Sequence, residues 1–438
     1  MHPRKQRVQV SPSCITTCSC MLLWAVFVLS HAGCSGQQAP VVVFAVGGAP
    51  AELAFWEEVV QDFARVKGIK AELLRRPADT DQQRQGLIIA LKAGMADPDV
   101  FLMDVAWLGL FAASHWLAPL DNIDRSVFFA QILTLVDEHH GQLLALPVYL
   151  DAGLLYYRQD LLAQFGFPQP PQTWPELLQQ AETVQQAMRQ YDPDFYGFVW
   201  QGRQYEGLIT NFQEFAGTPG GLVIEHDGHS RIALDLPQNR SALRFMHDLI
   251  WKRRISPLFT YTEMQEEETR RVFQRGSALF ERNWPYAWAL HQQAGSPVRG
   301  KIGVTLPPAP AGGKRVSALG GWHIGVSHFS DVKPLATAFV EYVCSYAVQK
   351  RMVLRLGWNP GRRDLYTDPE ILHHAPHVPV LQQALQAAQP RPVVPYYPQL
   401  SAIVQRRLNG VLAGRAEAAA ALQAAEREID ALLARYGR

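Results

Sequence analysis

Cysteine is scarce in this chain, which argues against a disulfide-based fold. Three of the five cysteines lie within the first 20 residues, so only Cys34 and Cys344 follow. Cys344 stands inside the apolar stretch 339–346, where burial as a small hydrophobic residue is favoured over reactivity. The 438 residues are 48% hydrophobic. A chain of this length and composition can bury a large core, and we expect two lobes or domains that depend on it for stability.

An excess of charge of one sign is absent as well. The sequence carries 41 Lys and Arg against 40 Asp and Glu, a formal net charge of +1, without a long block of like charges. Nucleic-acid binding and polybasic membrane attachment both need a strongly basic surface. The composition therefore argues against both classes, and we expect no nucleic-acid partner.

Short catalytic and cofactor motifs are missing too. The chain contains no GxSxG, HExxH or GxxxxGK[ST] pattern, and the glycine pair at 47–48 is not part of a GxGxxG fingerprint. The histidine pairs at 139–140 and 373–374 lack a third ligand at a suitable spacing for a metal. We therefore expect no catalytic residues, no metal site and no cofactor.

The N-terminus has the parts of an export signal. Basic residues precede an uninterrupted apolar run, Met21–Leu29, which is well short of the roughly 20 residues that a spanning helix needs. Cys34 closes a segment that resembles the end of a bacterial lipobox, although His31 stands where lipoproteins usually place leucine. We predict a signal peptide over 1–33 and a tether over 34–40. Lipidation of Cys34 would anchor the exported chain at the outer face of the cytoplasmic membrane, and simple secretion is the alternative.

Strands alternate with helices from residue 41 onward. The continuous apolar run Val41–Val46 predicts a buried strand of a parallel sheet, and Pro50 suits the first turn of the helix that follows. This order predicts an α/β fold with functional loops at the carboxyl ends of the strands, where Asp104 lies. Further predicted elements are a strand over 71–74, a helix over 82–92, a strand over 99–103, a helix capped by Thr173, a helix over 208–215 and a final helix over 416–436 that packs on its own domain.

Three clusters, at 200–206, 281–288 and 320–323, combine aromatic rings with polar side chains. The apolar face of a sugar ring lies on Trp or Tyr, while its hydroxyls donate to Asp or Glu and accept from Arg or backbone N–H. The clusters therefore indicate a carbohydrate ligand, with ordinary buried aromatics as the alternative. Candidates for these contacts are the acceptors Glu52, Asp104, Asp151 and Glu281, the donors Arg84 and Arg362, and the platforms Tyr149, Trp284, Tyr286 and Trp322.

Longer blocks of sequence carry a resemblance to a known family. The two longest are Asp97-Pro-Asp-Val-Phe-Leu-Met-Asp104-Val-Ala-Trp107 and Leu146-Pro-Val-Tyr149-Leu-Asp151-Ala-Gly-Leu-Leu-Tyr156-Tyr-Arg158, and shorter ones lie at 197–202, 280–288, 320–322, 357–362 and 391–398. Spread over residues 41–436, they closely resemble the solute-binding components of bacterial and archaeal sugar ABC importers (extracellular solute-binding protein family 1). Within that family the sequence is most similar to the trehalose/maltose-binding proteins.

The resemblance implies a two-lobe, periplasmic-binding-protein-like fold of type II, in which crossing segments hinge two α/β lobes. On this basis we expect the first lobe over 41–149 with a return over 306–350. The second lobe is expected over 150–305, with a return and the C-terminal helices over 351–438.

The resemblance also implies a ligand site in the cleft between the lobes. Carried over position by position, the ligand-binding residues are Glu52, Arg84, Asp104, Tyr149, Asp151, Glu281, Trp284, Tyr286, Gly320, Gly321, Trp322 and Arg362. Similar proteins tend to carry two adjacent arginines where Gln83 precedes Arg84 here, and this difference would weaken or re-tune one subsite.

The function implied is that of the extracytoplasmic sugar-binding subunit of an ABC importer. Such a protein captures an α-linked disaccharide, trehalose or maltose, by closure of its lobes and delivers it to the transmembrane subunits of the permease. Two alternatives share these residues. An exported glycoside hydrolase would use two of Asp104, Asp151 and Glu281, and a sensory module would present the bound sugar to a receptor.

Overall fold

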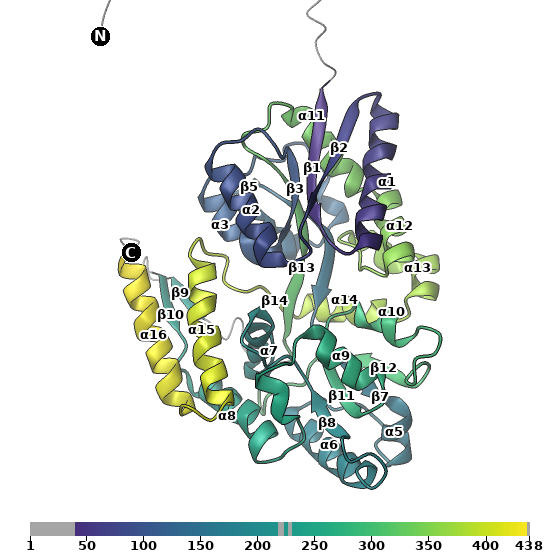
Figure 1. The fold of residues 1–438 in the computed structure, drawn as a ribbon, viewed down its shortest axis with the longest axis vertical. Helices are drawn as coiled ribbons and strands as arrows, with labels where there is room; N and C mark the ends of the chain where they lie inside the picture. Colours follow the sequence, from purple (N-terminus) through teal and green to yellow (C-terminus); the bar gives the residue numbers. More distant parts are fainter. Residues whose placement is uncertain (1–39, 218–222, 227–229, 436–438) are drawn as a thin grey trace, which may run out of the picture. The chain divides into compact units, whose positions relative to one another are not determined.

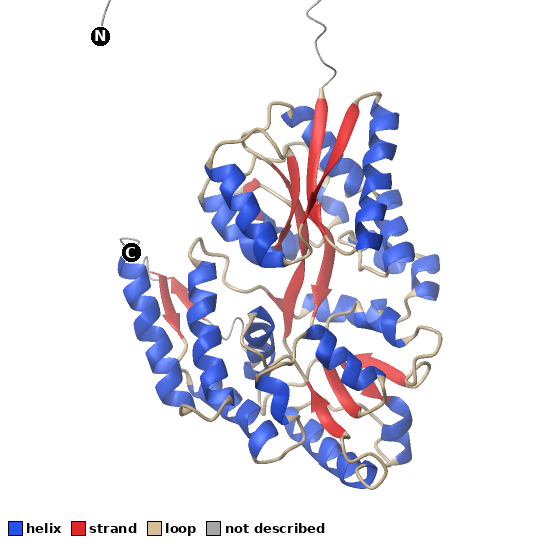
Figure 2. Ribbon diagram, in the orientation of Figure 1, coloured by secondary structure: helices blue, strands red, loops and turns tan. Residues whose placement is uncertain are grey.

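The computed structural model describes residues 40–217, 223–226 and 230–435. The predicted signal peptide (1–33) and the predicted lipidation site Cys34 lie outside the described residues. Residues from Pro40 onward belong to one compact unit. Figure 1 shows that this unit consists of two lobes, each built around its own sheet, and Figure 2 shows the helices that flank both sheets.

The sheet of the first lobe is mixed. Its strands follow the order β14-β13-β3-β1-β2, and β6 pairs with β13 on a separate path. Strand β1 pairs in parallel with β2 and β3, whereas β13 runs antiparallel to β3 and β6. The strands are β1 (Val41–Gly47), β2 (Lys70–Arg76), β3 (Val100–Asp104), β6 (Leu146–Ala152), β13 (Ser317–Val326) and β14 (Ala388–Gln389), with a small pair of β4 (Glu138–His139) and β5 (Gln142–Leu143).

Helices from two distant parts of the chain cover this sheet. Helix α1 begins with Pro50 at its first turn and ends at Lys67; Gly68 caps it with a left-handed φ of 64°, which suits a glycine. Phe55, Trp56 and Phe63 of α1 are buried against the sheet. The helices of this lobe are α1 (Pro50–Lys67), α2 (Thr80–Lys92), α3 (Leu108–Ala113), α4 (Ala130–Ile132), α11 (Lys333–Val343), α12 (Tyr346–Leu356), α13 (Pro369–His374) and α14 (Val378–Gln386).

The second lobe has a four-stranded sheet in the order β12-β7-β11-β8. Strand β11 pairs in parallel with β8 and antiparallel with β7. The elements are β7 (Leu154–Arg158), α5 (Gln159–Gln164), α6 (Trp174–Met188), β8 (Tyr196–Val199), α7 (Glu206–Ala216), the hairpin β9 (Val223–His226) and β10 (Ser230–Ala233), α8 (Pro237–Trp251), α9 (Glu266–Gln274), β11 (Ala278–Asn283), α10 (Ala287–His291), β12 (Ile302–Thr305), α15 (Tyr397–Leu412) and α16 (Ala418–Arg435).

The chain crosses between the lobes three times. The first crossing runs from β6 into β7 through Gly153, where a Cβ atom would lie only 1.8 Å from Oε1 of Glu214. The second runs from β12 into β13, and the third follows β14. Beneath the first crossing, Glu214 accepts hydrogen bonds from Nε (2.7 Å) and Nη2 (2.6 Å) of Arg282, with both side chains buried. This ion pair also receives the backbone N–H of Ala318 at 3.0 Å, so it joins β11, α7 and β13 at the hinge.

The last crossing lies later in the chain than the sequence predicts. We expected the second lobe to resume at residue 351, but α12 packs against α1 in the first lobe. Arg351 of α12 donates to Asp62 at 2.7 Å, and Arg355 pairs with Glu58. Helix α14 then packs against β6 and β13, so the chain returns to the second lobe only after β14. The predicted boundary was carried over from the family resemblance, and the helical pattern of α12 does not reveal the lobe against which this helix packs.

Most of the local predictions are confirmed. The predicted strands at 41–46, 71–74 and 99–103 correspond to β1, β2 and β3, and the predicted helices at 82–92 and 208–215 correspond to α2 and α7. Thr173 caps α6 by accepting from the N–H of Glu176 at 3.4 Å. The final helix packs against α15 and α8 of the second lobe, as expected. The parallel sheet is confirmed only for the first three strands, because β6 and β13 run antiparallel in it.

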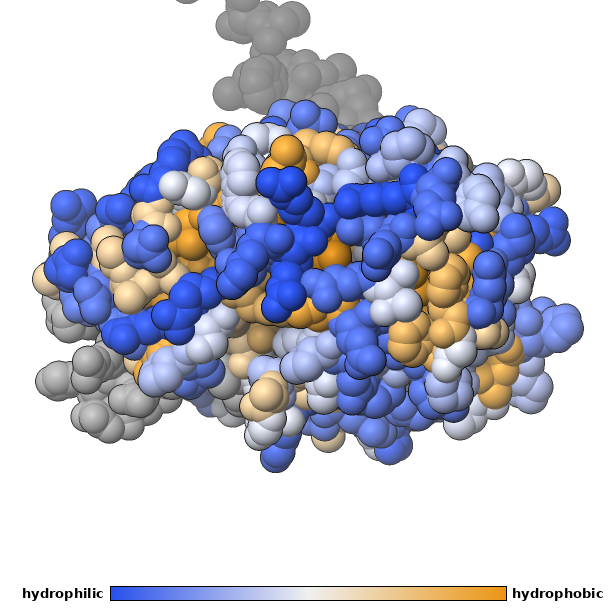
Figure 3. All heavy atoms as spheres, turned by 90° about the horizontal axis from the view of Figure 1, so that it is seen from below, coloured by the Kyte–Doolittle hydropathy of each residue, from blue (hydrophilic) through white to orange (hydrophobic). Residues whose placement is uncertain are grey.

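The surface of the second lobe is mixed in polarity. Figure 3 shows it from below, with hydrophilic residues separating smaller apolar patches. Its exposed large apolar side chains include Tyr191, Trp251 and Leu258. In the part of the chain that the structure describes, no helix combines the length and the apolarity required to cross a membrane.

Candidate functional site

A cavity of about 920 Å³ lies between the two lobes. From the first lobe it is lined by Asp79, Thr80, Asp81, Arg84, Asp104, Ala106, Trp107, Asp151, Gly321 and Trp322. From the second lobe and the last crossing it is lined by Gln204, Tyr205, Glu206, Gly207, Thr210, Gln265, Glu266, Glu267, Glu268, Arg271, Trp284, Tyr286, Arg391, Tyr397, Pro398, Ser401, Ala402 and Gln405. The lining therefore joins aromatic rings to eight carboxylates and three arginines.

Two tryptophans form the aromatic centre of this cavity. Trp322 lies on β13, and its ring meets that of Trp107 edge to face at 5.4 Å. Trp284 follows β11, and the guanidinium of Arg282 lies over its ring at 4.2 Å. A Cβ atom at Gly320 would lie 3.0 Å from the ring of Trp284, so glycine provides the space for this ring beside the strand. Both rings remain half-buried and border the cavity.

Asp151 is the carboxylate of β6 that faces the cavity. It accepts a hydrogen bond from Nδ2 of Asn359 at 2.9 Å. The pKa of Asp151 is raised to about 6, chiefly by burial; the hydrogen bond from Asn359 opposes this shift and the nearby charge of Asp104 adds to it. The protein therefore stabilises the negative charge of ionised Asp151 only weakly. A ligand that donates hydrogen bonds to this carboxylate would stabilise it.

The first turn of α9 contributes a row of carboxylates. Glu266 accepts from Nε1 of Trp284 at 3.3 Å, and burial raises its pKa. Glu267 accepts from the hydroxyl of Tyr286 at 2.8 Å, and hydrogen bonds from Arg270 lower the pKa of Glu267. Negative side chains are favourable at a helix N-terminus, which accounts for their concentration here.

Arg391 connects the two lobes across the cavity. Its Nη2 donates to Oδ1 of Asp104 at 3.3 Å and its Nη1 donates to Oε1 of Glu206 at 3.1 Å. The side chain is 5% exposed. Burial alone would lower the pKa of Arg391, but the charges of Asp104 and Glu206 outweigh burial and raise it. Its Nε is buried and has no hydrogen-bond partner among the described residues.

Seven of the twelve residues predicted for the ligand site line this cavity. They are Arg84, Asp104, Asp151, Trp284, Tyr286, Gly321 and Trp322. The other five are Glu52, Tyr149, Glu281, Gly320 and Arg362, which the cavity lining does not include. The structure thus brings together residues from α2, β3, β6, β13 and the segment after β11.

Three of the remaining five lie close behind the cavity. Glu52 accepts from the N–H of Ala49 at 2.9 Å and so caps α1. The ring of Tyr149 packs on Trp358 at 4.5 Å. Gly320, as described above, makes room for Trp284.

The other two predicted residues have different partners. Glu281 is fully buried, where it accepts from Nδ2 of Asn283 at 2.6 Å and lies 2.7 Å from Nε2 of His291. Side chains alternate along a strand, so Glu281 points to the face of β11 opposite Arg282. Arg362 pairs with Asp364 at 2.6 Å. The alternation along β11 is a sequence signal that could have separated Glu281 from the cavity.

Gln83, which replaces an expected arginine, is buried rather than in the cavity lining. A Cβ atom at Gly47 would lie 2.4 Å from Nε2 of Gln83, so the amide fills the space beside this glycine. Gln83 does not border the cavity, so the prediction that it weakens or re-tunes a subsite is not supported by a direct contact with the ligand space.

Sequence reasoning missed the acidic N-terminus of α9, the acidic turn before α2 and the whole contribution of α15. Asp79 caps α2 by accepting from the N–H of Gln82 at 2.8 Å, which is a recognisable helix start. Three consecutive glutamates at 266–268 were also a visible signal. Within the described ranges, the structure holds no cluster of three or more His, Cys, Asp or Glu that could bind a metal.

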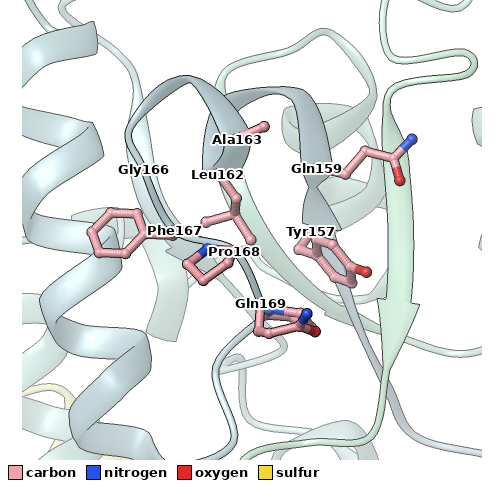
Figure 4. Close-up of a pocket in the computed structure, with 9 residues that line it drawn as sticks. Tyr157, Gln159, Leu162, Ala163, Gly166, Phe167, Pro168 and Gln169 are labelled. Carbon is pink, nitrogen blue, oxygen red and sulfur yellow. The ribbon is translucent and has the colours of Figure 1, made fainter.

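A second, smaller cavity of about 450 Å³ lies within the second lobe. Its lining comes from one segment, residues 157–170, and contains no charged side chain. Figure 4 shows Tyr157, Gln159 and Gln169 around it. The cavity between the lobes is the stronger candidate, because several elements direct polar and aromatic groups into it.

Comparison with known proteins agrees with this arrangement. Residues 47–350 match the family model for bacterial extracellular solute-binding proteins. A "probable ABC transporter-binding protein" of Deinococcus radiodurans is 34% identical over 84% of this chain and 87% of its own length. A maltotriose-binding protein of Pyrococcus abyssi is 25% identical over 88% of this chain and 79% of its own length.

A solved structure leads to the same family. The maltose-bound MalE3 of T. maritima is 34% identical, with a TM-score of 0.80 over 90% of this chain and 99% of that one. The neighbouring structures confirm the predicted type II fold. The homologues are binding proteins of ABC transporters rather than enzymes, so the glycoside hydrolase alternative is set aside. The chain belongs to the bacterial extracellular solute-binding proteins.

Proposed function

We propose that this protein is the extracytoplasmic sugar-binding subunit of an ABC importer and that it captures an α-linked disaccharide, trehalose or maltose. The observation that carries the proposal is the meeting of Trp284, Tyr286 and Trp322 with Asp104 and Asp151 in one cavity. Aromatic faces suit the apolar face of a sugar, and carboxylates suit its hydroxyls. The relatives with bound maltose or named for maltotriose support the same class of ligand.

Each part of the cavity has a role in this proposal. Trp322 and Trp284 stack on the rings, Asp151 and Asp104 accept from hydroxyls, and the guanidinium of Arg391 lines the same cavity. Arg391 takes the donor role that the sequence analysis gave to Arg362. Because the groups come from both lobes, a bound sugar favours the closed state over the open one, and the permease recognises the closed form. Attachment through lipid at Cys34 would keep the protein beside its permease.

Titration calorimetry of the chain without its signal peptide tests the proposal. Trehalose, maltose, sucrose and glucose form the panel. We expect saturable binding of trehalose or maltose, weaker binding of glucose, and recovery of the sugar intact. Absence of binding to all four sugars would reject the proposed ligand class, and release of glucose from the disaccharides would reject a pure binding function.

A further inference from the structure

Buried side chains hold both backbone polar groups of Trp284. Its N–H donates to Oδ1 of Asn283 at 2.8 Å. Its carbonyl oxygen accepts from the hydroxyl of Tyr156 at 2.9 Å. Asn283 and Tyr156 are both fully buried, and the cavity lining includes neither of them. The ring of Trp284 thus borders the cavity, while the groups that hold its backbone do not.

Hydrogen bonds determine which way the amide of Asn283 faces. Its Nδ2 donates to Oε1 of Glu281 at 2.6 Å and to the carbonyl oxygen of Glu266 at 3.1 Å. An amide nitrogen donates and an amide oxygen accepts. The reverse orientation would set Oδ1 against two acceptors and Nδ2 against the N–H of Trp284, so all three bonds would be lost. The amide therefore has one orientation, with Oδ1 towards Trp284.

A buried cluster on the same face of β11 supports this amide. Glu281 and Asn283 are two positions apart on the strand, so their side chains lie on one face, opposite Arg282. Tyr156 of β7 pairs with Glu281 in the register of the sheet. Oε2 of Glu281 lies 2.7 Å from Nε2 of His291, whose ring meets that of Tyr156 edge to face at 5.4 Å. The polar groups of this cluster are thus directed at each other and at the backbone before the cavity.

Different groups hold the ring of Trp284 on its cavity side. The guanidinium of Arg282 lies over the ring at 4.2 Å, and Nε1 of the ring donates to Glu266 at 3.3 Å. Glu266 is also the residue whose carbonyl oxygen accepts from Asn283. The contacts that Asn283 makes towards the cavity therefore all lead to Trp284.

We propose that Asn283 and Tyr156 are positioning residues that set the orientation of Trp284 in the sugar site, with the buried Glu281 and His291 orienting them. The inference rests on the proposed sugar-binding function, and it gives Glu281 a role without contact to the ligand. An aromatic ring binds the apolar face of a sugar only when its own face is presented to it. Loss of either backbone bond therefore lowers the affinity through Trp284.

Fluorine NMR of protein labelled with fluorotryptophan tests the orientation of Trp284 without a ligand. The proteins compared are the wild type, Asn283→Ala and the control Asn409→Ala. The signal of Trp284 is the one that disappears in Trp284→Phe. Asn409 is 4% exposed on α15 in the same lobe and outside the cavity lining, and its Nδ2 donates to the carbonyl oxygens of Tyr261 (2.8 Å) and Gly202 (3.2 Å). Both variants thus remove a buried amide from the second lobe.

We expect Asn283→Ala to shift or split the resonance of Trp284. Asn409→Ala should leave this resonance in place, although both variants should unfold at a lower temperature than the wild type. A cluster that only stabilised the lobe would not produce this difference. An unchanged resonance in Asn283→Ala, or an equal change in Asn409→Ala, would overturn the inference.

Titration calorimetry with maltose then measures the effect on binding. We expect Asn283→Ala to lower the affinity by about tenfold, the scale of one lost hydrogen bond, and Asn409→Ala to stay within about twofold of the wild type. In a Trp284→Ala background, Asn283→Ala should cost less than about twofold, because residues that act through one another are not additive. Equal losses in the two backgrounds would overturn the inference. If the wild type does not bind maltose while its Trp284 resonance responds to Asn283→Ala, the proposed function fails and the positioning of the ring stands.

Should Asn283→Ala not fold, Tyr156→Phe provides a milder change. It removes only the hydroxyl that donates to the carbonyl oxygen of Trp284 and keeps the ring in the core. It should shift the Trp284 resonance, and it should lower the maltose affinity of the wild type but not that of Trp284→Ala. A resonance that does not move would contradict the positioning role.

Discussion

We expect the titration of one residue, Asp151, to make the sugar affinity of the site depend on pH. Its pKa of about 6 lies above its ordinary value, chiefly because of burial, so the free protein takes up a proton there as the pH falls through 6. Sugar hydroxyls need the ionised carboxylate as acceptor. We predict that the affinity for the disaccharide falls about tenfold between pH 7 and pH 5, measured by calorimetry at several pH values.

Asp151→Asn is the matched variant for this prediction. It should cost about 1.5 to 3 kcal/mol of binding free energy at pH 7, the scale of a hydrogen bond to a charged group, and it should flatten the pH profile. The stability of the free protein should move in the other direction. Because the folded-state pKa of Asp151 is raised, this group makes the free energy of unfolding increase as the pH falls from 7 towards 4. A wild-type affinity that does not change with pH would contradict this role.

The site predicted from the sequence and the site in the structure contain different arginines. Arg391 lines the cavity and bridges Asp104 and Glu206, whereas Arg362 pairs with Asp364 away from the lining. We predict that Arg391→Ala lowers sugar affinity by more than about tenfold, while Arg362→Ala leaves it within about twofold. Calorimetry on the two variants measures the difference. The reverse order of effects would return the donor role to Arg362.

Trp322 is one of the two tryptophans that we propose stack on the sugar rings. Truncation to alanine removes a half-buried ring from the centre of the cavity and wets the neighbouring polar groups. We predict that Trp322→Ala reduces the affinity by at least about 2 kcal/mol, as expected for an aromatic hot spot. Trp251→Ala is the control, because Trp251 is 39% exposed on α8 and outside the cavity lining. Equal affinities in the two variants would remove Trp322 from the site.

At the scale of elements, the buried pair of Arg282 and Glu214 ties β11 to α7 at the hinge. Glu214→Gln would leave a buried guanidinium without its counter-charge, and we predict a loss of about 3 to 5 kcal/mol in the free energy of unfolding. Chemical denaturation measures this loss.

The control for that prediction is Glu428→Gln on α16. Glu428 pairs with Arg406 and Arg407 near the surface, where the side chains of the two arginines are 53% and 39% exposed. Surface ion pairs contribute about 0 to 1 kcal/mol, so this variant should unfold close to the wild type. Similar losses in the two variants would mean that the hinge pair is no more important than a surface pair.

Some helices and strands could be predicted from the sequence, and others could not be assigned to a lobe. Strand β1 and helix α1 follow from a continuous apolar run and from apolar residues at helical spacing, both of which are local signals. Asp104 was placed at the cleft correctly, since it ends a parallel strand. The position of α12 and α14 in the first lobe could not be read in this way, because their apolar faces fit either lobe.

Contacts in the site between residues far apart in the chain could not be predicted from the sequence either. Asp104 and Arg391 are 287 positions apart in the chain, and their pairing depends on the path of the third crossing. Neither residue carries a local signal for the other. Resemblance to a family supplied most of the centre of the cavity, but α15 also contributes Ser401, Ala402 and Gln405, which no motif marked. The centre of the cavity was thus predictable, whereas the walls that α9 and α15 contribute were not.

At the scale of the whole molecule, the central claim is that a sugar binds between the lobes. Hydrogen exchange measured by mass spectrometry, with and without maltose, tests where it binds. The first N–H groups of a helix lack partners within the helix, so the first turns of α2 and α9 should exchange readily and report on a ligand. One turn lies in each lobe, and residues of both line the cavity.

We predict that maltose slows exchange at both of these turns together, because a ligand between the lobes contacts both. Protection in one lobe alone would contradict binding by closure. Protection confined to residues 157–170, around the smaller cavity of the second lobe, would place the ligand outside the cleft and contradict the central claim.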